Sequence, residues 1–317
     1  PAPDVLLMLR HLGFTYVRLP LNSDDWTGDT SDIRAAHRAL EDALAALERA
    51  DLASMVDFHP SEKLRQLAER APISARGAVM GAWQTIAPRL AHYAPAMVFP
   101  ELLNEPPFER THWLGLRDDL IAEVRSACPD HTIIWGADRY QTIGETMGMP
   151  LPDDPNTVVA VHYYTPMSFT HQCADWDQSG LARISGLPFP AAADTPAVRA
   201  LSEKLSAAAD EQALAMLNED LALPWTARRI HADLEEIANW AAAAGTTVLL
   251  NEFGVLKACV DTRSRDNWIG AVRASAEAHG IGWGYWELDH GFGFLQDRQS
   301  LAGLDESLLA ALTGGGR

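Results

Sequence analysis

Short apolar runs alternate with longer amphipathic stretches along the whole chain of 317 residues. The apolar runs are rich in β-branched and aromatic residues, and most are continuous, which is typical of strands buried on both faces. They lie at residues 14–20, 53–60, 96–106, 131–137, 157–164, 247–253 and 281–288. The clearest helical patterns lie at 31–51, 111–127, 225–245 and 264–280. This alternation predicts a parallel sheet covered by helices, and seven repeats suit a (β/α)8 TIM barrel better than an open sheet.

One interval, residues 165–224, breaks this rhythm because it is too long for an ordinary loop between a strand and a helix. It follows the strand at 157–164 and ends in a long Ala-rich helical pattern. We therefore expect it to lie over the end of the sheet that carries the chemistry. No linker rich in Gly, Ser or Pro separates two parts of the chain, so residues 1–317 are predicted to form a single catalytic domain.

Composition limits the partners. The formal charge of −18 repels nucleic acid and anionic membrane surfaces, so neither is expected as a partner. A neutral substrate is expected instead. No apolar run reaches the roughly 18 residues of a membrane span. Three cysteines, Cys128, Cys173 and Cys259, allow at most one disulfide, and their spacing does not show whether it forms. The chain opens without an initiator Met or a signal-peptide pattern, as a processed fragment would.

Polar or aromatic residues end most of the predicted strands. In a parallel βα barrel these ends meet at one mouth, where active sites lie. Each residue alone has a structural explanation, such as a surface ion pair or a hydrogen-bonded histidine, but their coincidence at the same end of most strands favours a functional site. The residues are Arg18, His59, Asn104, Glu105, His162, Tyr164, Glu252 and Trp286.

Two glutamates at such a mouth indicate cleavage of a glycosidic bond, which needs one protonated and one ionised carboxyl group. Arg18 is a candidate to keep one of them ionised, and Tyr164 can donate a hydrogen bond to the same group. Metal binding by His59, Glu105, His162 and Glu252 is the alternative. No HExxH or similarly close ligand spacing exists, and an arginine in the cluster opposes a cation, so no metal or other cofactor is expected.

The chain resembles glycoside hydrolase family 5, the cellulase and mannanase family. The stretches that carry the likeness are "LRHLGFTYVRLPL", "DFHP", "YAPAMVFPELLNEP", "VHYY", "LLNEFG" and "GYWEL". They occur in the family's order over residues ~5–295, and only the interval 165–224 matches poorly. The resemblance implies the (β/α)8 barrel of a retaining hydrolase, with the insertion placed after the family's sixth strand.

The resemblance also implies roles for the tip residues. Glu105 becomes the acid/base and Glu252 the nucleophile of a double displacement, with the carboxyl groups roughly 5–5.5 Å apart. Asn104 is expected to hydrogen-bond the sugar 2-hydroxyl group.

Five further residues receive supporting roles from the same resemblance. Arg18 and Tyr164 are expected to orient Glu252 and to stabilise its charge. His162 is expected near Glu105, while His59 lines the cleavage subsite and Trp286 forms the floor beneath the sugar.

One departure from the family concerns the first strand. Only about a dozen helix-like residues precede the run at 14–20, so the first βα unit is predicted to be missing or truncated. Such a barrel exposes two strand edges unless another segment fills the gap.

Aromatic residues near the tips favour a β-linked sugar chain as the substrate. Trp26 follows the Arg18 strand and Trp176 lies in the long interval, and both are predicted as sugar platforms. Phe108 and Trp113, past Glu105, are further candidates, whereas Trp268 lies on a helical pattern and is assigned to packing.

The predicted activity is that of an endo-β-1,4-glucanase. An exo-β-glucosidase or a β-mannanase of the same family is the alternative, because the interval 165–224 either closes one end of the cleft or leaves it open. A non-catalytic carbohydrate-binding barrel is the alternative from another class. The expected partner is a β-linked oligo- or polysaccharide, the expected state a monomer, and the expected location secreted or periplasmic.

Overall fold

The structure is a computed structural model that describes residues 1–27, 30–176 and 179–315. It contains two compact units, which are described separately here. The first comprises Pro1–His162 and Ala241–Leu249, and the second comprises Tyr163–Trp240 and Leu250–Arg317. The predicted single catalytic domain stays a prediction. No helix among the described residues is long and apolar enough to cross a membrane.

The first unit alternates strands and helices as predicted. Its strands are β1 (Tyr16–Asn22), β2 (Ala53–His59), β3 (Val98–Glu101), β4 (Ile133–Gly136) and β5 (Thr157–Tyr163), whose last residue belongs to the second unit. Its helices are α1 (Pro3–His11), α2 (Asp24–Thr27), α3 (Thr30–Arg49), α4 (Glu62–Arg70), α5 (Pro72–Leu90), α6 (Arg110–Ala127), the 3-10 turn η1 (Arg139–Gln141) and α7 (Ile143–Met147). The described residues before β1 form α1 and no strand.

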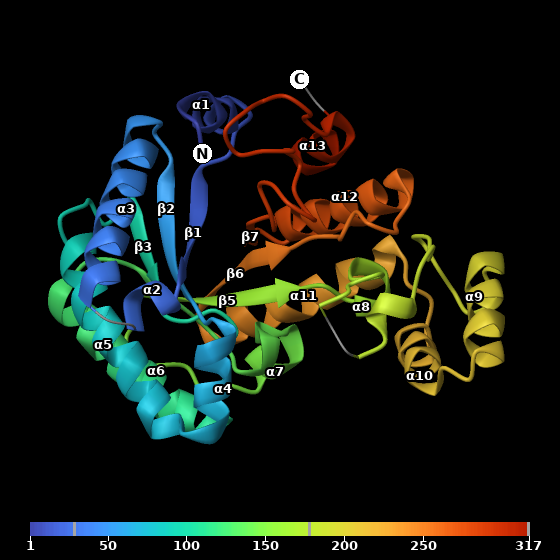
Figure 1. Cartoon of the computed structure of the whole chain (residues 1–317), viewed down its shortest axis with the longest axis horizontal. Coiled ribbons are helices and arrows are strands. Elements are labelled where there is room, and N and C mark those ends of the chain that lie inside the picture. The colour runs from blue at the N-terminus through green and yellow to red at the C-terminus, as the bar shows by residue number, and fades with distance from the viewer. Residues whose placement is uncertain (28–29, 177–178, 316–317) are drawn as a thin grey trace. The chain divides into compact units, whose positions relative to one another are not determined.

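The strands β1 to β5 are neighbours in chain order, and each pair is parallel. The helices α3, α5 and α6 pack on β2, β3 and β4 (Figure 1). Their apolar residues, such as Leu44, Ile86 and Leu120, are buried against the strands. On the opposite face, Met55, Ile134 and Ala160 form a second apolar cluster with Tyr16 and Phe99 packed on it. Both faces of this sheet are therefore covered, which explains its continuous apolar strands.

The second unit contains most of β6 (Thr247–Phe253) and all of β7 (Gly282–Trp283). Its helices are α8 (Met167–Thr170), the 3-10 turn η2 (Leu181–Arg183), α9 (Pro196–Ala207), α10 (Glu211–Asp220), most of α11 (Ala227–Ala244), α12 (Thr262–Ala278) and α13 (Glu306–Thr313). The strand β7 is shorter than predicted. The chain nevertheless continues along β6, because Gly284 N–H donates to Leu250 and Trp286 N–H donates to Phe253.

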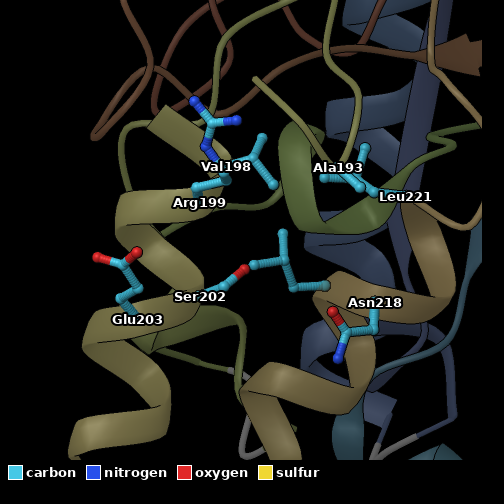
Figure 2. Close-up of a pocket in the computed structure, with 8 residues that line it drawn as sticks. Ala193, Val198, Arg199, Ser202, Glu203, Asn218 and Leu221 are labelled. Atoms are coloured by element: carbon cyan, nitrogen blue, oxygen red, sulfur yellow. The ribbon is translucent and has the colours of Figure 1, made fainter. Parts of the chain in front are cut away.

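The interval 165–224 folds into α8, η2, α9 and α10, so its predicted helical part is confirmed. An isolated antiparallel bridge pairs Ala191, before α9, with Trp225, after α10. A cavity of about 250 Å³ lies between α9 and α10 (Figure 2). Arg199, Glu203 and Asn218 are among its lining residues, which include none of the predicted site residues. The position of the interval over the active-site face stays a prediction.

One disulfide joins this interval to the segment after β6. Cys173 and Cys259 are bonded, while Cys128 is a buried free thiol. The two bonded cysteines are 86 residues apart, so the bond closes a long loop and restricts the unfolded chain.

We predict that replacing both bonded cysteines by serine lowers the free energy of unfolding by about 2–5 kcal/mol, because the unfolded chain regains the freedom of that loop. The measurement is urea unfolding of wild type and of the Cys173→Ser/Cys259→Ser variant, each with and without dithiothreitol. Reductant should lower the stability of the wild type but not that of the double variant. Cys128→Ser is the matched control and should keep the response to reductant. Equal stability of oxidised and reduced wild type would contradict the prediction.

Candidate active site

The interior face of the first unit changes from apolar to polar along β2 and β3. Side chains two residues apart in a strand share a face, so Asp57 and His59 follow Met55 on the same side of β2. Asp57 pairs in register with Glu101 of β3, and this places two carboxyl groups next to one another on neighbouring strands. Both are fully buried. A buried pair of carboxyl groups requires a cation.

Arg18 of β1 supplies this cation. Its guanidinium donates two hydrogen bonds of 2.8 Å to the two oxygens of Glu101, and it lies 3.1 Å from Asp57. The same guanidinium donates to the side-chain oxygen of Asn104 at 2.8 Å. Arg18 therefore links the buried carboxyl groups of Asp57 and Glu101 to Asn104, just beyond the end of β3.

The contact with Arg18 fixes the orientation of the Asn104 amide. A guanidinium only donates, so the Asn104 oxygen faces Arg18 and its NH2 group faces His59 Nε2 at 3.3 Å. Nε2 of His59 is then the acceptor, and Nδ1–H donates to Asp57 at 2.8 Å. Asp57, Arg18, Asn104 and His59 form a closed ring of polar contacts, which we call the Arg18 ring.

One positive charge faces two carboxylates in this region. Burial raises the pKa of Glu101, the charge of Arg18 opposes this rise, and the charge of Asp57 adds to it, so that the pKa lies above the ordinary value. Glu101 therefore retains its proton to a higher pH than an exposed glutamate does. The retained proton reduces the net charge of the buried group.

Glu105 lies just beyond β3 and meets His162 at the end of β5. His162 Nδ1 and Glu105 Oε1 are 3.0 Å apart, and Arg65 of α4 lies 3.7 Å from the other oxygen. The backbone N–H of Glu105 donates to the side-chain oxygen of Gln141 at 2.6 Å. The φ angle of Glu105 is +39°, an unusual value for a residue other than glycine. Backbone and carboxyl group are thus both held by the first unit.

The pKa of Glu105 is set by opposing influences. Burial, the largest of them, raises it, but the hydrogen bond and charge of His162, together with the charge of Arg65, outweigh burial. The pKa consequently lies below the ordinary value of a glutamate. His162 therefore favours the ionised form of Glu105.

Glu252 lies in β6 and belongs to the second unit, together with Tyr164. The Tyr164 hydroxyl donates to Glu252 Oε1 at 2.8 Å, the contact that the family resemblance implied. Glu252 is buried. Tyr164 is in turn packed edge-on against His171 and Phe292, with ring centroids 4.9 and 6.2 Å apart. Because this packing fixes the ring of Tyr164, its hydroxyl holds the carboxylate of Glu252 in one orientation.

Trp286 is held close to the end of β6. A Cβ atom at Gly254 would lie 2.1 Å from the Trp286 carbonyl oxygen, so only glycine allows this approach. The indole packs against an apolar cluster that includes Ala174, Leu256 and Phe292. Trp286 is partly exposed, as a sugar platform requires.

Trp176 is 61% exposed and lies edge-on to His171 at 6.4 Å. It follows Cys173, and the disulfide attaches this segment to the chain after β6. An exposed indole on an anchored loop suits the predicted role of a sugar platform.

Trp26 does not suit the role predicted for it. Its ring is only 4% exposed and packs against His37 of α3 at 5.2 Å, so the structure assigns it to the core. Phe108 and Trp113 are also buried. Trp113 lies within α6 and donates its indole N–H to the Gly136 carbonyl at 2.9 Å, which ties the helix to the end of β4. Trp268, assigned to packing from the sequence, is indeed buried.

The predicted site residues are thus gathered in each unit. The first unit brings together Arg18, His59, Asn104, Glu105 and His162. The second holds Tyr164, Trp176, Glu252 and Trp286. The predicted separation of Glu105 and Glu252, and the predicted contact of Arg18 with Glu252, stay predictions.

Sequence reasoning missed three buried polar residues, Asp57, Glu101 and Gln141. Asp57 and Glu101 were visible as acidic residues inside apolar strands, where an unpaired carboxyl group is costly. That position alone signals a buried partner. Gln141 gives no such signal, because a glutamine after a strand is ordinary.

A family comparison follows from this geometry. The model of the cellulase family, glycosyl hydrolase family 5, matches residues 1–291. The chain therefore belongs to glycoside hydrolase family 5.

Two relatives illustrate the range of similarity. Endoglucanase 3 of Fibrobacter succinogenes is 28% identical over 238 residues, which cover 71% of this chain and 35% of that protein. Cellodextrinase A of Ruminococcus flavefaciens is 26% identical over 175 residues, or 52% of this chain and 51% of that protein. The matched part of the chain thus spans about a third and a half, respectively, of the length of these relatives.

Solved structures match the chain over almost its whole length. Cel5A of Thermotoga maritima in complex with cellobiose aligns with a TM-score of 0.79 at 22% identity, covering 98% of this chain and 90% of that one. Its complex with mannotriose aligns with a TM-score of 0.78. The predicted fold class, an α/β TIM barrel, is confirmed by this likeness and by the family.

We predict that Glu101→Gln changes the pH dependence of stability. The pKa of Glu101 is raised in the folded protein, so its stabilising contribution is present at acidic pH and is lost as pH rises towards the folded pKa. The difference in free energy of unfolding, wild type minus variant, should therefore fall between pH 4 and pH 8. Urea unfolding at several pH values measures it, with the exposed Glu69→Gln as control. A difference that grows with pH would mean that Arg18 dominates and the prediction is wrong.

Proposed function

We propose that this protein is a retaining endo-β-1,4-glucanase in which Glu252 is the nucleophile and Glu105 the acid/base. The observation that carries the proposal is the family match over residues 1–291, which includes both glutamates and their neighbouring motifs. The contacts of Glu105 with His162 and of Glu252 with Tyr164 support the assignment of different roles to the two carboxyl groups.

In the first step a carboxylate oxygen of Glu252 attacks the anomeric carbon, and the bond from that carbon to the leaving oxygen breaks. The proton carried by Glu105 passes to the leaving oxygen. A covalent glycosyl-enzyme results. The hydrogen bond from Tyr164 orients the attacking carboxylate before the reaction.

In the second step a water molecule attacks the anomeric carbon from the opposite side to Glu252. Glu105, now ionised, removes a proton from the water, and the bond from the sugar to Glu252 breaks. Two inversions give net retention of the anomeric configuration. A carboxyl separation of roughly 5–5.5 Å is expected for this mechanism.

The Arg18 ring supports the role proposed for Asn104. Because Arg18 fixes the amide oxygen, the amide NH2 group can donate only on the side of His59. A 2-hydroxyl group of the sugar is a suitable acceptor there. Trp286 offers an apolar face for the same sugar ring, and Trp176 is proposed to bind a sugar further along the chain.

The substrate is proposed to be a β-1,4-linked glucan. Relatives named endoglucanase and cellodextrinase support glucose units. A β-mannan is the second candidate, because Cel5A of Thermotoga maritima has been solved with both cellobiose and mannotriose. Exo action on short oligosaccharides remains the alternative to endo action.

A secreted or periplasmic location is proposed. The Cys173–Cys259 disulfide supports it, because disulfides persist in oxidising compartments. A monomer is proposed as the working state.

We predict that the two glutamate variants lose activity in different ways. Glu252→Ala should give no turnover above background on a panel of β-glucans and β-mannans, since the nucleophile is absent. Glu105→Gln should lower kcat by roughly 10²–10⁴-fold on natural linkages, which need an acid, and far less on dinitrophenyl glycosides, whose leaving group needs none. Product analysis by proton NMR should show retention of configuration.

Two outcomes would contradict the proposed function. Wild-type activity no higher than that of Glu252→Ala on every substrate would instead support a carbohydrate-binding barrel. Loss of activity with a chelator, restored by a divalent cation, would favour the metal alternative. Activity should otherwise be the same with and without chelator.

We predict that His162 controls the alkaline limb of the pH profile. Catalysis needs a protonated Glu105, so kcat/KM falls as pH rises through the pKa of this group. His162 lowers that pKa, hence His162→Phe should raise it and move the alkaline limb to higher pH. His162→Gln, which keeps a donor but no charge, should give an intermediate shift. The exposed His112→Gln is the control, and an unmoved or downward-shifted limb in His162→Phe would refute the assignment.

A further inference from the structure

The turn after β4 has an unusual backbone. Arg139, Tyr140 and Gln141 have φ angles of 52°, 64° and 51°, so three consecutive residues other than glycine adopt the left-handed conformation. Each such residue costs free energy, and a run of them persists only where the surrounding contacts fix it. Strained backbone of this kind concentrates at functional sites.

The turn directs the side chain of Gln141 back over the end of β4. Gln141 is fully buried. A Cβ atom at Gly136, the last residue of β4, would lie 2.1 Å from the Gln141 amide nitrogen, so the glutamine occupies the space that a side chain at 136 would need. The absence of a side chain at Gly136 and the position of Gln141 are thus parts of one arrangement.

The amide of Gln141 connects the two strands on either side of β4. Its oxygen accepts the backbone N–H of Glu105, beyond β3, at 2.6 Å. Its nitrogen donates to the carbonyl of Ala160 in β5 at 3.4 Å. Ala160 lies two residues before His162, the partner of the Glu105 carboxyl group. Gln141 therefore joins the backbone of Glu105 to β5, the strand that carries His162.

The backbone of Glu105 needs such support because its own φ angle is left-handed. The preceding N–H, that of Asn104, donates to the Phe58 carbonyl at 3.0 Å. The N–H of Glu105 donates instead to the side-chain oxygen of Gln141. The orientation of this peptide plane sets the direction of the Glu105 side chain towards His162.

We propose that Gln141 is a positioning residue for the acid/base: through the Glu105 N–H and the Ala160 carbonyl it fixes the Glu105 carboxyl group relative to His162. The proposal rests on the proposed function for the role of Glu105. A purely structural role of Gln141 predicts lower stability without a selective loss of acid catalysis.

Three variants separate these roles. Gln141→Met keeps the volume above Gly136 but removes both hydrogen bonds. Gln141→Glu keeps an acceptor for the Glu105 N–H, loses the donor to Ala160, and adds a negative charge near Glu105. Gly136→Ala leaves Gln141 intact and displaces it by steric conflict. The matched control is Gln172→Met in the second unit, since Gln172 is also fully buried and hydrogen-bonds to the backbone of Phe169 and Leu187.

The readout is the dependence of kcat/KM on the leaving group, measured with aryl cellobiosides of differing leaving-group acidity. Gln141→Met and Gly136→Ala should lose roughly 10–100-fold on poor leaving groups and little on dinitrophenol, because only the former need a well-placed acid. Gln141→Glu should also move the alkaline limb of the pH profile upward, because a nearby negative charge favours the protonated form of Glu105. Gln172→Met should lose stability without either effect.

The outcomes distinguish the two proposals. If Glu105→Gln shows the leaving-group dependence and Gln141→Met shows none, the positioning role is wrong and the proposed function stands. If Glu105→Gln shows none, the proposed role of Glu105 fails. Nitrogen-15 NMR of His162 then decides on positioning without activity: an altered His162 titration in Gln141→Met supports the role, and an unchanged one overturns it.

Discussion

The polar half of the first unit depends on one guanidinium group. Arg18 is the cation that offsets the buried carboxylates Asp57 and Glu101, and it is also the donor that orients Asn104. Removing one partner from such a buried group leaves an uncompensated charge, which is far more costly than the intact arrangement. Because the ring closes through His59 back to Asp57, no member can turn without breaking two contacts. The contacts that orient Asn104 and His59 are therefore the same contacts that stabilise the buried charges of this region.

Tryptophans supply a second constraint, from the outer side of the sheet. Trp83 of α5 donates its indole N–H to the Leu102 carbonyl, and Trp113 of α6 donates to the Gly136 carbonyl. These carbonyls lie just beyond β3 and at the end of β4, where regular pairing stops and the backbone needs other partners. In the second unit Trp268 does the same for Thr165 after β5. The strand ends that carry the site are thus anchored by the helices behind them.

This use of tryptophan explains where the sequence could and could not predict the site. Strands and the polar residues at their tips follow from local patterns, so the seven strands among the described residues and the tip residues themselves were predictable. The partners of Glu105 and Glu252 followed only from the family resemblance. A tryptophan shortly after a strand looks the same whether it faces solvent or the core. Trp26 was therefore predicted as a platform and is buried, whereas Trp176 is exposed. Gln141 depends on three left-handed residues and on Gly136, which no local pattern specifies.

Glu105 and Glu252 also have different hydrogen-bond partners, and the protein sets this difference before a substrate binds. Glu105 lies 3.0 Å from the imidazole of His162, a group that can hold or release a proton near neutral pH. Glu252 meets a phenol, which donates a hydrogen bond without changing its own charge at that pH. A carboxyl group that must exchange a proton in each half of a reaction needs a partner such as the imidazole. A carboxyl group that must remain an oriented nucleophile needs a partner such as the phenol. The strand-end residues His162 and Tyr164, only two positions apart in the chain, thus give the two glutamates the chemical asymmetry that the proposed double displacement requires.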